Sequence, residues 1–315
     1  MNESLAKYLA GLLDADGSLA FQKRTIPGES NIWFGLELFL GSADTIDKNG
    51  FVASLPDLTG FGSVFRRFAP TGVTEQTVWR VRRRADLEML LPRVIKHMVI
   101  KAKHWQWVLD TWREHRSRGY GNTCLSEDEW KALVEESKAS RRERVGPLKP
   151  KNHPTWAWLT GFLDGDGYYS FRTSRNRNMR VGVTTHVDDA SVLYFLQNAF
   201  GGEVKAYPTK PSPREWSRGL GPANGSFALR FLPNLVKHSR LKKHKIEQMI
   251  HWHRQRLSVL GTEGIDRRRG RLPERFVCDT PKCNRDHYAR GKCKMHYNHA
   301  WRDGKFGVSD SLNAS

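Results

Sequence analysis

Residues 9–17 read LAGLLDADG and residues 159–167 read LTGFLDGDG, so six of the nine positions are identical at an offset of 150 residues. The stretch after each copy is also similar. Apolar and polar residues alternate from Ser18 to Arg24 in the first copy and from Tyr168 to Ser174 in the second. Self-similarity at a fixed spacing indicates that the chain is built from two equivalent halves.

Each half continues with the same succession of elements. A second β-like run covers 32–40 and 179–186. Two further strand candidates follow in each half, at 62–68 and 77–84 in the first and at 203–207 and 226–232 in the second. Each half closes with apolar residues at helical spacing. These stripes are Val94, Met98, Trp105, Val108 and Trp112 in the first half, and Ile246, Met249, Ile250, His253 and Leu257 in the second. The pattern predicts an α+β fold in which helix, hairpin, helix, hairpin and helix occur twice.

The same pattern suggests where the domains begin and end. We expect a first domain at 1–118, a linker with a charged helix at 119–153 and a second domain at 154–260. Ser126 with Glu129 is typical of a capping box that opens the linker helix. The stretch 208–224 is rich in Pro and Gly and is expected to be a loop. A basic linker at 261–275 and a small cysteine-bearing module at 276–315 complete the chain.

The charge indicates the kind of partner. The 315 residues include 52 Lys and Arg against 33 Asp and Glu, a formal net charge of +19. An excess of this size favours a polyanion, and nucleic acid comes first because Lys and Arg neutralise phosphates. A membrane surface is the rival, but the sequence has no apolar stretch of spanning length. We therefore expect an intracellular, cytoplasmic protein of bacterial or phage type that acts on nucleic acid.

The repeated motif places acidic residues where a helix tolerates them poorly. Each copy is expected to form a helix that ends near its last Asp, with Gly17 and Gly167 as left-handed C-caps. Carboxylates at that end meet the negative end of the helix dipole and cost stability, which suggests that they serve a function. The four acids are Asp14, Asp16, Asp164 and Asp166.

Small residues recur four apart in both copies, and they would let the two helices pack closely. These interface candidates are Gly11, Ala15, Gly161 and Gly165. If the helices pack face to face, their acidic ends meet at one place. A converging pair of carboxylates can hold hard divalent cations through oxygen ligands, and such cations activate water in phosphodiester hydrolysis. A calcium-binding loop is excluded, because the later Glu that it requires is absent from both copies.

The two nonapeptides resemble the defining motif of LAGLIDADG homing endonucleases in their single-chain, two-motif form, over roughly residues 3–258. The resemblance implies a monomer with two β-sheets that straddle double-stranded DNA as a saddle. It implies a double-strand break that depends on Mg²⁺ (or Mn²⁺) and leaves short 3′ overhangs. It also implies that Asp16 and Asp166 are the metal ligands, while Asp14 and Asp164 belong to the interface and helix ends.

The family also tends to place a basic residue near the active site, at the start of the closing helix. Lys101 is the best match in the first half. In the second half the register leaves Lys242 and Lys243 open, and Lys243 is taken here as the catalytic candidate.

Strands expose alternate residues to one face, and Gln and Arg are suited to reading purine edges. Family analogy therefore assigns a DNA-binding role to polar residues on the predicted strands and the turns beside them. They are Gln22, Arg24, Arg66, Arg80, Arg82, Arg84, Ser170, Arg172, Ser174, Arg175, Arg177 and Arg230.

The C-terminal module contains a second candidate metal site. Cys278, Cys283, Cys293 and His296 follow the pattern Cys-x4-Cys-x9-Cys-x2-His. Three thiolates and one imidazole form a closed tetrahedral set for Zn²⁺. His287 and His299 are alternative ligands. A module of this size is too small for a core of its own, so zinc would stabilise it, and its basic surroundings suggest that it extends the DNA footprint.

Two other functions fit the same sequence. An RNA maturase would use this fold and charge to bind intron RNA and assist splicing. A non-cleaving DNA-binding regulator would keep the scaffold without the chemistry, although the intact Asp16 and Asp166 argue against it.

Replacement of one predicted zinc ligand tests the C-terminal site. We expect Cys283→Ser to lower the zinc bound per chain, measured by elemental analysis of the purified protein, because three ligands hold the ion less tightly than four. Cys124→Ser is the control, since Cys124 lies far from the pattern. Unchanged zinc content in Cys283→Ser would refute the assignment.

Overall fold

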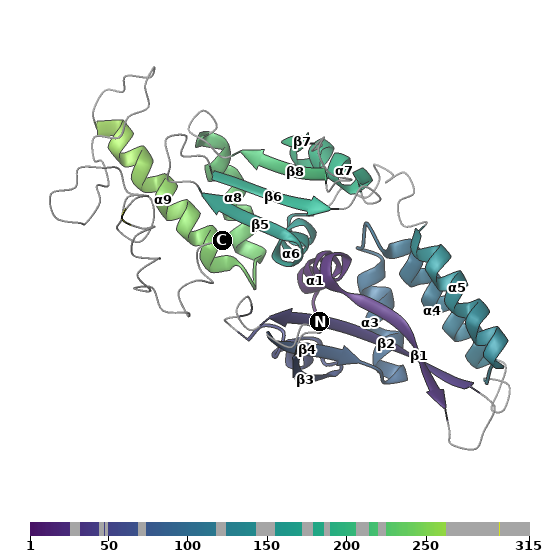
Figure 1. Ribbon diagram of the computed structural model, residues 1–315. Coiled ribbons are helices and arrows are strands. Elements are labelled where there is room, and N and C mark those ends of the chain that lie inside the picture. The colour runs from purple at the N-terminus through teal and green to yellow at the C-terminus, as the bar shows by residue number, and fades with distance from the viewer. Residues whose placement is uncertain are drawn as a thin grey trace.

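In the computed structural model, the chain forms two similar halves on either side of a central pair of helices (Figure 1). The structure describes residues 1–25, 32–43, 47, 50–68, 74–117, 124–142, 155–171, 179–185, 190–205, 214–219, 225–262 and 296.

The first half begins with helix α1 (Glu3–Asp16) and the hairpin β1 (Ser18–Thr25) and β2 (Ile32–Ala43). A short helix α2 (Leu55–Thr59) then leads to β3 (Ser63–Phe68) and β4 (Glu75–Val81). Helices α3 (Arg84–Ile95) and α4 (Ala102–Ser117) close the half. The strands form one antiparallel sheet in the order β1-β2-β4-β3.

The second half repeats this order. Helix α6 (Trp156–Gly165) precedes β5 (Gly167–Phe171), β6 (Met179–Thr185), α7 (Ala190–Phe200), β7 (Glu203–Lys205) and β8 (Arg214–Gly219). Helices α8 (Gly225–His238) and α9 (Lys243–Thr262) follow. The sheet order β5-β6-β8-β7 matches that of the first half strand for strand, which confirms the predicted α+β repeat.

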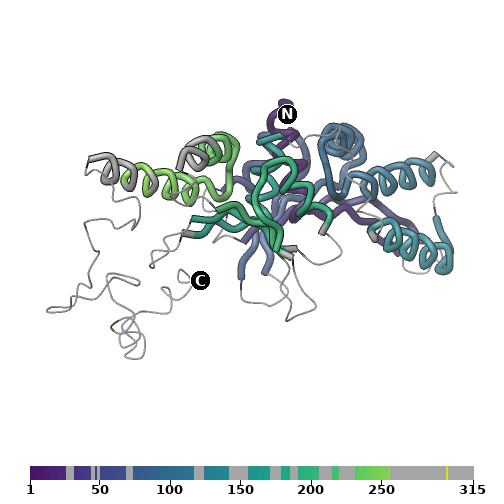
Figure 2. The backbone as a smooth tube through the Cα atoms, turned by 90° about the horizontal axis from the view of Figure 1, so that it is seen from above, coloured from purple at the N-terminus to yellow at the C-terminus, as the bar shows by residue number. Residues whose placement is uncertain are grey.

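Helices α1 and α6 contact each other more extensively than any other two elements described. Residues Tyr8–Asp14 of α1 and Ala157–Asp164 of α6 are buried without interruption. A helix that is apolar all round belongs in a core rather than on a surface. Figures 1 and 2 show the consequence, because the sheets lie beside this pair and helices α5 and α9 extend from the centre in opposite directions.

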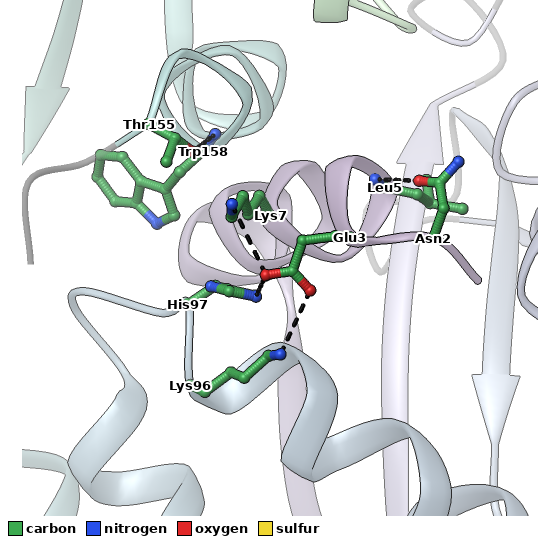
Figure 3. Close-up of polar contacts among 8 residues, drawn as sticks. All are labelled: Asn2, Glu3, Leu5, Lys7, Lys96, His97, Thr155 and Trp158. Carbon is green, nitrogen blue, oxygen red and sulfur yellow. Dashed lines mark hydrogen bonds and ion pairs between the residues drawn. The ribbon is translucent and has the colours of Figure 1, made fainter.

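Side chains fix where each central helix begins (Figure 3). Asn2 Oδ1 accepts from the Leu5 amide at 2.9 Å, and Thr155 Oγ1 accepts from the Trp158 amide at 3.2 Å, as expected of N-cap residues. At the start of α1, Glu3 also forms ion pairs with Lys7 (3.6 Å), Lys96 (3.3 Å) and His97 (2.9 Å). The last two partners tie α1 to the turn between α3 and α4.

Glycine allows the two helices to touch backbone to backbone. A Cβ added at Gly11 would lie 1.9 Å from the Trp158 carbonyl oxygen, and one at Gly161 would lie 2.0 Å from that of Tyr8. Gly165 packs against Ala15, with 2.5 Å between a built Cβ and the Ala15 Cβ. The small residues singled out in the sequence therefore lie where α1 meets α6.

The prediction of left-handed C-caps is wrong. Gly17 has φ −71° and ψ 143°, an extended conformation, and Gly167 already belongs to β5. Glycine is needed there because of close contact: a Cβ at Gly17 would lie 2.6 Å from the Leu13 carbonyl oxygen, and one at Gly167 would lie 2.5 Å from that of Leu163. The chain leaves each helix directly into a strand.

Two other expectations were also wrong. The run 226–232 lies in helix α8, and the strand it was meant to supply is β8, within the stretch expected to be a loop. The residues Phe227, Leu229 and Phe231 alternate like a strand, but short apolar runs do not separate the two structures.

The closing stripe of the first half also divides between two helices. Val94 lies in α3 and Met98 in the turn after it, so only the last three members of the stripe belong to α4. Each half thus has one more helix than expected.

The linker helix forms as predicted. Helix α5 (Glu127–Arg142) begins at a capping box in which Glu129 accepts from the Ser126 amide at 2.8 Å, and the Glu129 amide donates to Ser126 Oγ at 3.2 Å. A salt bridge from Lys23 to Glu127, with 2.7 Å between Nζ and Oε2, ties α5 to β1.

Filling the helix contact tests the dependence of the fold on it. We expect Gly11→Ala to lower the free energy of unfolding by about 3 kcal/mol, at the upper end for an added methyl group, because this methyl group meets backbone rather than a movable side chain. Gly219→Ala is the matched control, since a Cβ there has nothing within 4 Å. Equal stability of the two variants in chemical denaturation would contradict the packing described.

Candidate active site and nucleic-acid interface

The first Asp of the first motif is a buried anchor. Asp14, 3% exposed, accepts hydrogen bonds from the amides of Val99 (2.7 Å) and Lys101 (2.8 Å) in the turn before α4. It also accepts from the Trp158 indole Nε1 of α6 at 2.8 Å. Burial raises the pKa of Asp14, and these hydrogen bonds and the Lys101 charge oppose that shift.

The first Asp of the second motif has the same role. Asp164, 1% exposed, accepts from Ser239 Oγ (2.8 Å) and from the amides of Arg240 (2.8 Å) and Leu241 (3.1 Å), just before α9. The Tyr8 hydroxyl of α1 completes the set at 2.8 Å. Each anchor therefore joins its own closing helix to the opposite half of the molecule.

The two cross-half donors were missed in the sequence. Tyr8 and Trp158 stand at the same position of the two motifs, 150 residues apart, and each points its polar atom at the other motif. Aromatic residues with a polar tip, paired at the repeat offset, were the available signal. They make the contact between α1 and α6 directional as well as close.

The last Asp of each motif lies at the exposed end of its helix. Asp16 and Asp166 are both exposed, in contrast to the anchors two residues before them. Partial burial at the helix junction, followed by repulsion from Asp166, raises the pKa of Asp16 to about 6, while Lys242 and Lys101 act in the opposite direction. Asp16 Oδ2 would lie 2.9 Å from a Cβ built on Gly165, the residue before Asp166, so the two acids lie close together although they come from different halves.

A lysine lies beneath each of these helix ends. Lys101, 9% exposed, donates from Nζ to the carbonyl oxygens of Leu13 (3.1 Å), Ala15 (2.9 Å) and Gly17 (2.9 Å). The Leu13 carbonyl also accepts from the Gly17 amide at 3.0 Å, and the ammonium group adds a hydrogen bond to each of the three carbonyls at this helix end.

Lys242 does the same in the second half. Its Nζ, also in a side chain that is 9% exposed, donates to the carbonyl oxygens of Leu163 (3.0 Å), Gly165 (2.8 Å) and Gly167 (2.6 Å). Burial lowers the pKa of Lys242 to about 8, although Asp164 and Asp16 oppose the shift.

The structure corrects the choice of Lys243 as the counterpart of Lys101. Lys243 is exposed and its nearest acidic partner is Glu247 at 3.9 Å, so the counterpart is Lys242. A second repeat would have decided the register: residues 91–97 read LPRVIKH and residues 232–238 read LPNLVKH. Four residues beyond each stands the buried lysine.

Two exposed carboxylates fit a divalent cation that takes its other ligands from water and a substrate phosphate, as Mg²⁺ does. Repulsion from Asp166 contributes to the raised pKa of Asp16, and a cation bound between the two carboxylates would relieve that repulsion. No three His, Cys, Asp or Glu side chains gather within the described ranges, so the protein supplies an incomplete set there.

One face of the first sheet carries most of the DNA-binding candidates described. Directly opposite residues of antiparallel strands point to the same side. Leu38 and Trp79 point into the core, so Gln22, Arg24 and Arg80 lie on the other face. The Arg80 guanidinium lies 4.8 Å from the centre of the Phe65 ring. Two residues missed in the sequence share this face, Arg67 and Gln76, which are paired across β3 and β4.

Three candidates of the first half are not on that face of a strand. Arg66 pairs with Thr77 on the opposite side of the sheet and approaches Glu75 at 3.9 Å. Arg82 follows the end of β4, and Arg84 is the first residue of α3. The strand expected to reach residue 84 ends at residue 81, because Arg83 is the N-cap of α3, which begins at Arg84.

In the second half, Ser170 pairs with Arg180 on the face opposite the buried Tyr169. Arg230 belongs to α8 rather than to a strand. Seven candidates, four for DNA binding and three for zinc binding, lie outside the described residues. They are Arg172, Ser174, Arg175, Arg177, Cys278, Cys283 and Cys293. Of the predicted zinc ligands only His296 is described.

No protein-family model and no curated protein matches the sequence. Solved structures do match. The chain superimposes on the I-SmaMI LAGLIDADG homing endonuclease bound to cleaved DNA with a TM-score of 0.60 and 16% identity, covering 84% of this chain and 93% of that one. For the homing endonuclease I-GzeII in complex with its DNA target, the TM-score is 0.59 at 14% identity, covering 82% and 91%.

A third match is a double lysine-to-alanine mutant of I-SmaMI, with a TM-score of 0.59 and 17% identity over 82% of this chain and 94% of that one. The protein therefore has the two-domain LAGLIDADG fold. In the portion of the chain that the structure describes, no helix is both long and apolar enough to cross a membrane.

The raised pKa of Asp16 predicts that its charge destabilises the metal-free protein. The group holds its proton up to about pH 6 in the folded state against 3.8 ordinarily, so its contribution to stability is lost as the pH rises through that window. We expect Asp16→Asn to raise the free energy of unfolding by roughly 1 kcal/mol at pH 7.5 in the presence of a chelator, a value reduced by solvent screening.

The gain should disappear near pH 4, where both proteins are uncharged at this position. Asp128→Asn is the control, because the Asp128 side chain is 96% exposed. A metal-free Asp16→Asn protein no more stable than the parent at pH 7.5 would count against the burial and the repulsion from Asp166 that raise the pKa of Asp16.

Proposed function

We propose that the protein is a site-specific homing endonuclease that makes a metal-dependent double-strand break in a long DNA target, with short 3′ overhangs. The observation that carries this is the meeting of Asp16 and Asp166 at the ends of two helices from different halves. One active site shared by two equivalent halves suits a substrate with two strands. The net charge of +19 and the fold shared with endonucleases solved on DNA support the same conclusion.

In this proposal each half binds one half of the target. The sheet face with Gln22, Arg24 and Arg80 reads base edges, and the corresponding face near Ser170 and Arg180 does so for the other half-site. Phosphate contacts set the register, and contacts to base edges set the sequence preference. Strands β1 and β5 begin directly after the motif helices. A sheet that binds the DNA therefore also determines where Asp16 and Asp166 approach the DNA backbone.

Asp16 and Asp166 would hold Mg²⁺ or Mn²⁺ between the protein and the scissile phosphates. The bound cation would supply activation of water and stabilisation of the leaving oxygen. The chain itself provides the two carboxylates, keeps them exposed, and holds their backbone through the anchors Asp14 and Asp164. The module with Cys278, Cys283, Cys293 and His296 would bind Zn²⁺ and add DNA affinity.

The test begins with a cleavable site selected from a randomised DNA library. We expect Asp16→Asn and Asp166→Asn each to lower Mg²⁺-dependent double-strand cleavage by more than about a hundredfold, beyond the loss typical of residues that only support a metal site. Binding to the same duplex, measured by gel shift, should persist. Asp128→Asn is the control and should cleave normally.

Full cleavage by the double Asn variant would overturn the assignment of the acids. Binding of DNA without nicking under any divalent cation would favour the non-cleaving regulator. Failure to select any DNA site, together with tight binding of intron RNA, would favour the maturase.

A further inference from the structure

The amino groups of Lys101 and Lys242 have no donor left over for a substrate. An ammonium group has three N–H donors. In each lysine three main-chain carbonyl oxygens lie within hydrogen-bond distance of Nζ, between 2.9 and 3.1 Å for Lys101 and between 2.6 and 3.0 Å for Lys242. Both side chains are only 9% exposed. A contact with a phosphate would require at least one of these bonds to break.

The carbonyl groups that they hold are those on either side of the reacting acids. Lys101 binds the carbonyls of Ala15 and Gly17, the residues before and after Asp16. Lys242 binds those of Gly165 and Gly167, which flank Asp166. In each half, one ammonium group is thus hydrogen-bonded to the backbone on both sides of the carboxylate. At this place the helix ends and the chain turns at once into a strand. The last helical hydrogen bonds run from the Gly17 amide to the Leu13 carbonyl (3.0 Å) and from the Asp166 amide to the Phe162 carbonyl (3.1 Å), and the lysine adds its bonds just there.

The lysines are themselves held by their surroundings. The Lys101 amide donates to the anchor Asp14 at 2.8 Å, so the same residue grips its motif through both backbone and side chain. In the second half the amide of Leu241, next to Lys242, donates to Asp164 at 3.1 Å. The positive charge also balances the negative end of each helix dipole and the acid placed there.

We propose that Lys101 and Lys242 are positioning residues, which fix the backbone around Asp16 and Asp166, and that neither donates to the scissile phosphate nor transfers a proton in the reaction. The inference rests on the proposed endonuclease function for the role of the two acids. It differs from the catalytic role expected for a basic residue at this place.

The first measurement uses the unaltered protein. Lysines are acetylated at low reagent excess, and their modification is followed by mass spectrometry in the absence of DNA. We expect Lys101 and Lys242, just before α4 and α9, to resist modification, while Lys103 and Lys243, which are exposed in the first turns of these helices, react. Equal reactivity of the two pairs would overturn the proposal, because groups open to the reagent are also open to DNA.

The second measurement uses Lys101→Met and Lys242→Met, with Lys103→Met and Lys243→Met as matched controls. We expect the first two variants to melt at least about 3 °C below the controls, since three carbonyls each lose a hydrogen bond from the ammonium group. The Mn²⁺ concentration that gives half-maximal cleavage should rise about tenfold, as for residues that support metal ligands. The rate at saturating Mn²⁺ and its pH profile should match those of the parent.

A catalytic role for the lysines predicts the opposite result, in which the cleavage rate and its pH profile change while the melting temperature does not. Melting temperatures equal to those of the controls, with a lower rate at saturating Mn²⁺ and a changed pH profile, would overturn the proposal. If either Met variant fails to fold, the acetylation experiment still decides the question. Acetylation and melting need no cleavage, so a protein that never cuts DNA would contradict the proposed function and leave the structural part of this test standing.

Discussion

The backbone contact between α1 and α6 is the constraint on which the rest of the molecule depends. Gly11 and Gly161 let each helix place a Cα against a carbonyl of the other, where a Cβ would lie 2 Å or less from oxygen. At that separation Tyr8 reaches Asp164 and Trp158 reaches Asp14, so the two halves share one hydrogen-bonded core. The position of the sheets follows, because each strand β1 and β5 begins directly after its helix.

The contact between α1 and α6 places two pairs of acidic residues close together, one pair stabilised by hydrogen bonds and the other destabilised by repulsion. Asp14 and Asp164 are buried, and their cost is offset by hydrogen bonds from backbone and side chains of both halves. Asp16 and Asp166, two residues further on, are left exposed and repel each other. Natural chains usually keep such a local conflict only where function needs it. The proposed endonuclease would use this conflict to attract a cation beside the DNA phosphates.

Much of this architecture could be predicted from the sequence because the repeat is strong around the motif. The paired motifs, the hairpins that follow them and the capping box at Ser126 all depend on local patterns. Helix α8 and strand β8 could not be predicted in this way. Residues 226–232 alternate like a strand although they form a helix, and β8, with the fully buried Trp216, lies in a Pro- and Gly-rich run that is typical of a loop. Tertiary packing decided both segments.

The sequence predicted the acidic residues of the candidate site, but only some of the lysines and strand residues around them. Asp16 and Asp166 follow from the motif, but the choice between Lys242 and Lys243 required the second repeat at 91–97 and 232–238. The sheet faces needed the strand register, which moved Arg66 to the far side and added Arg67. Register depends on pairing partners distant in sequence, so alternation within one strand could not supply it.

The proposed endonuclease requires one metal site made from the carboxylates of both halves. Anomalous X-ray scattering from crystals of the protein with its cleavable duplex and Mn²⁺ would locate this metal. We expect Mn²⁺ at the end of the α1–α6 pair, in contact with Asp16 and Asp166 and with the DNA backbone. Ordered Mn²⁺ elsewhere on the protein–DNA complex, with both carboxylates turned away from any cation, would contradict it.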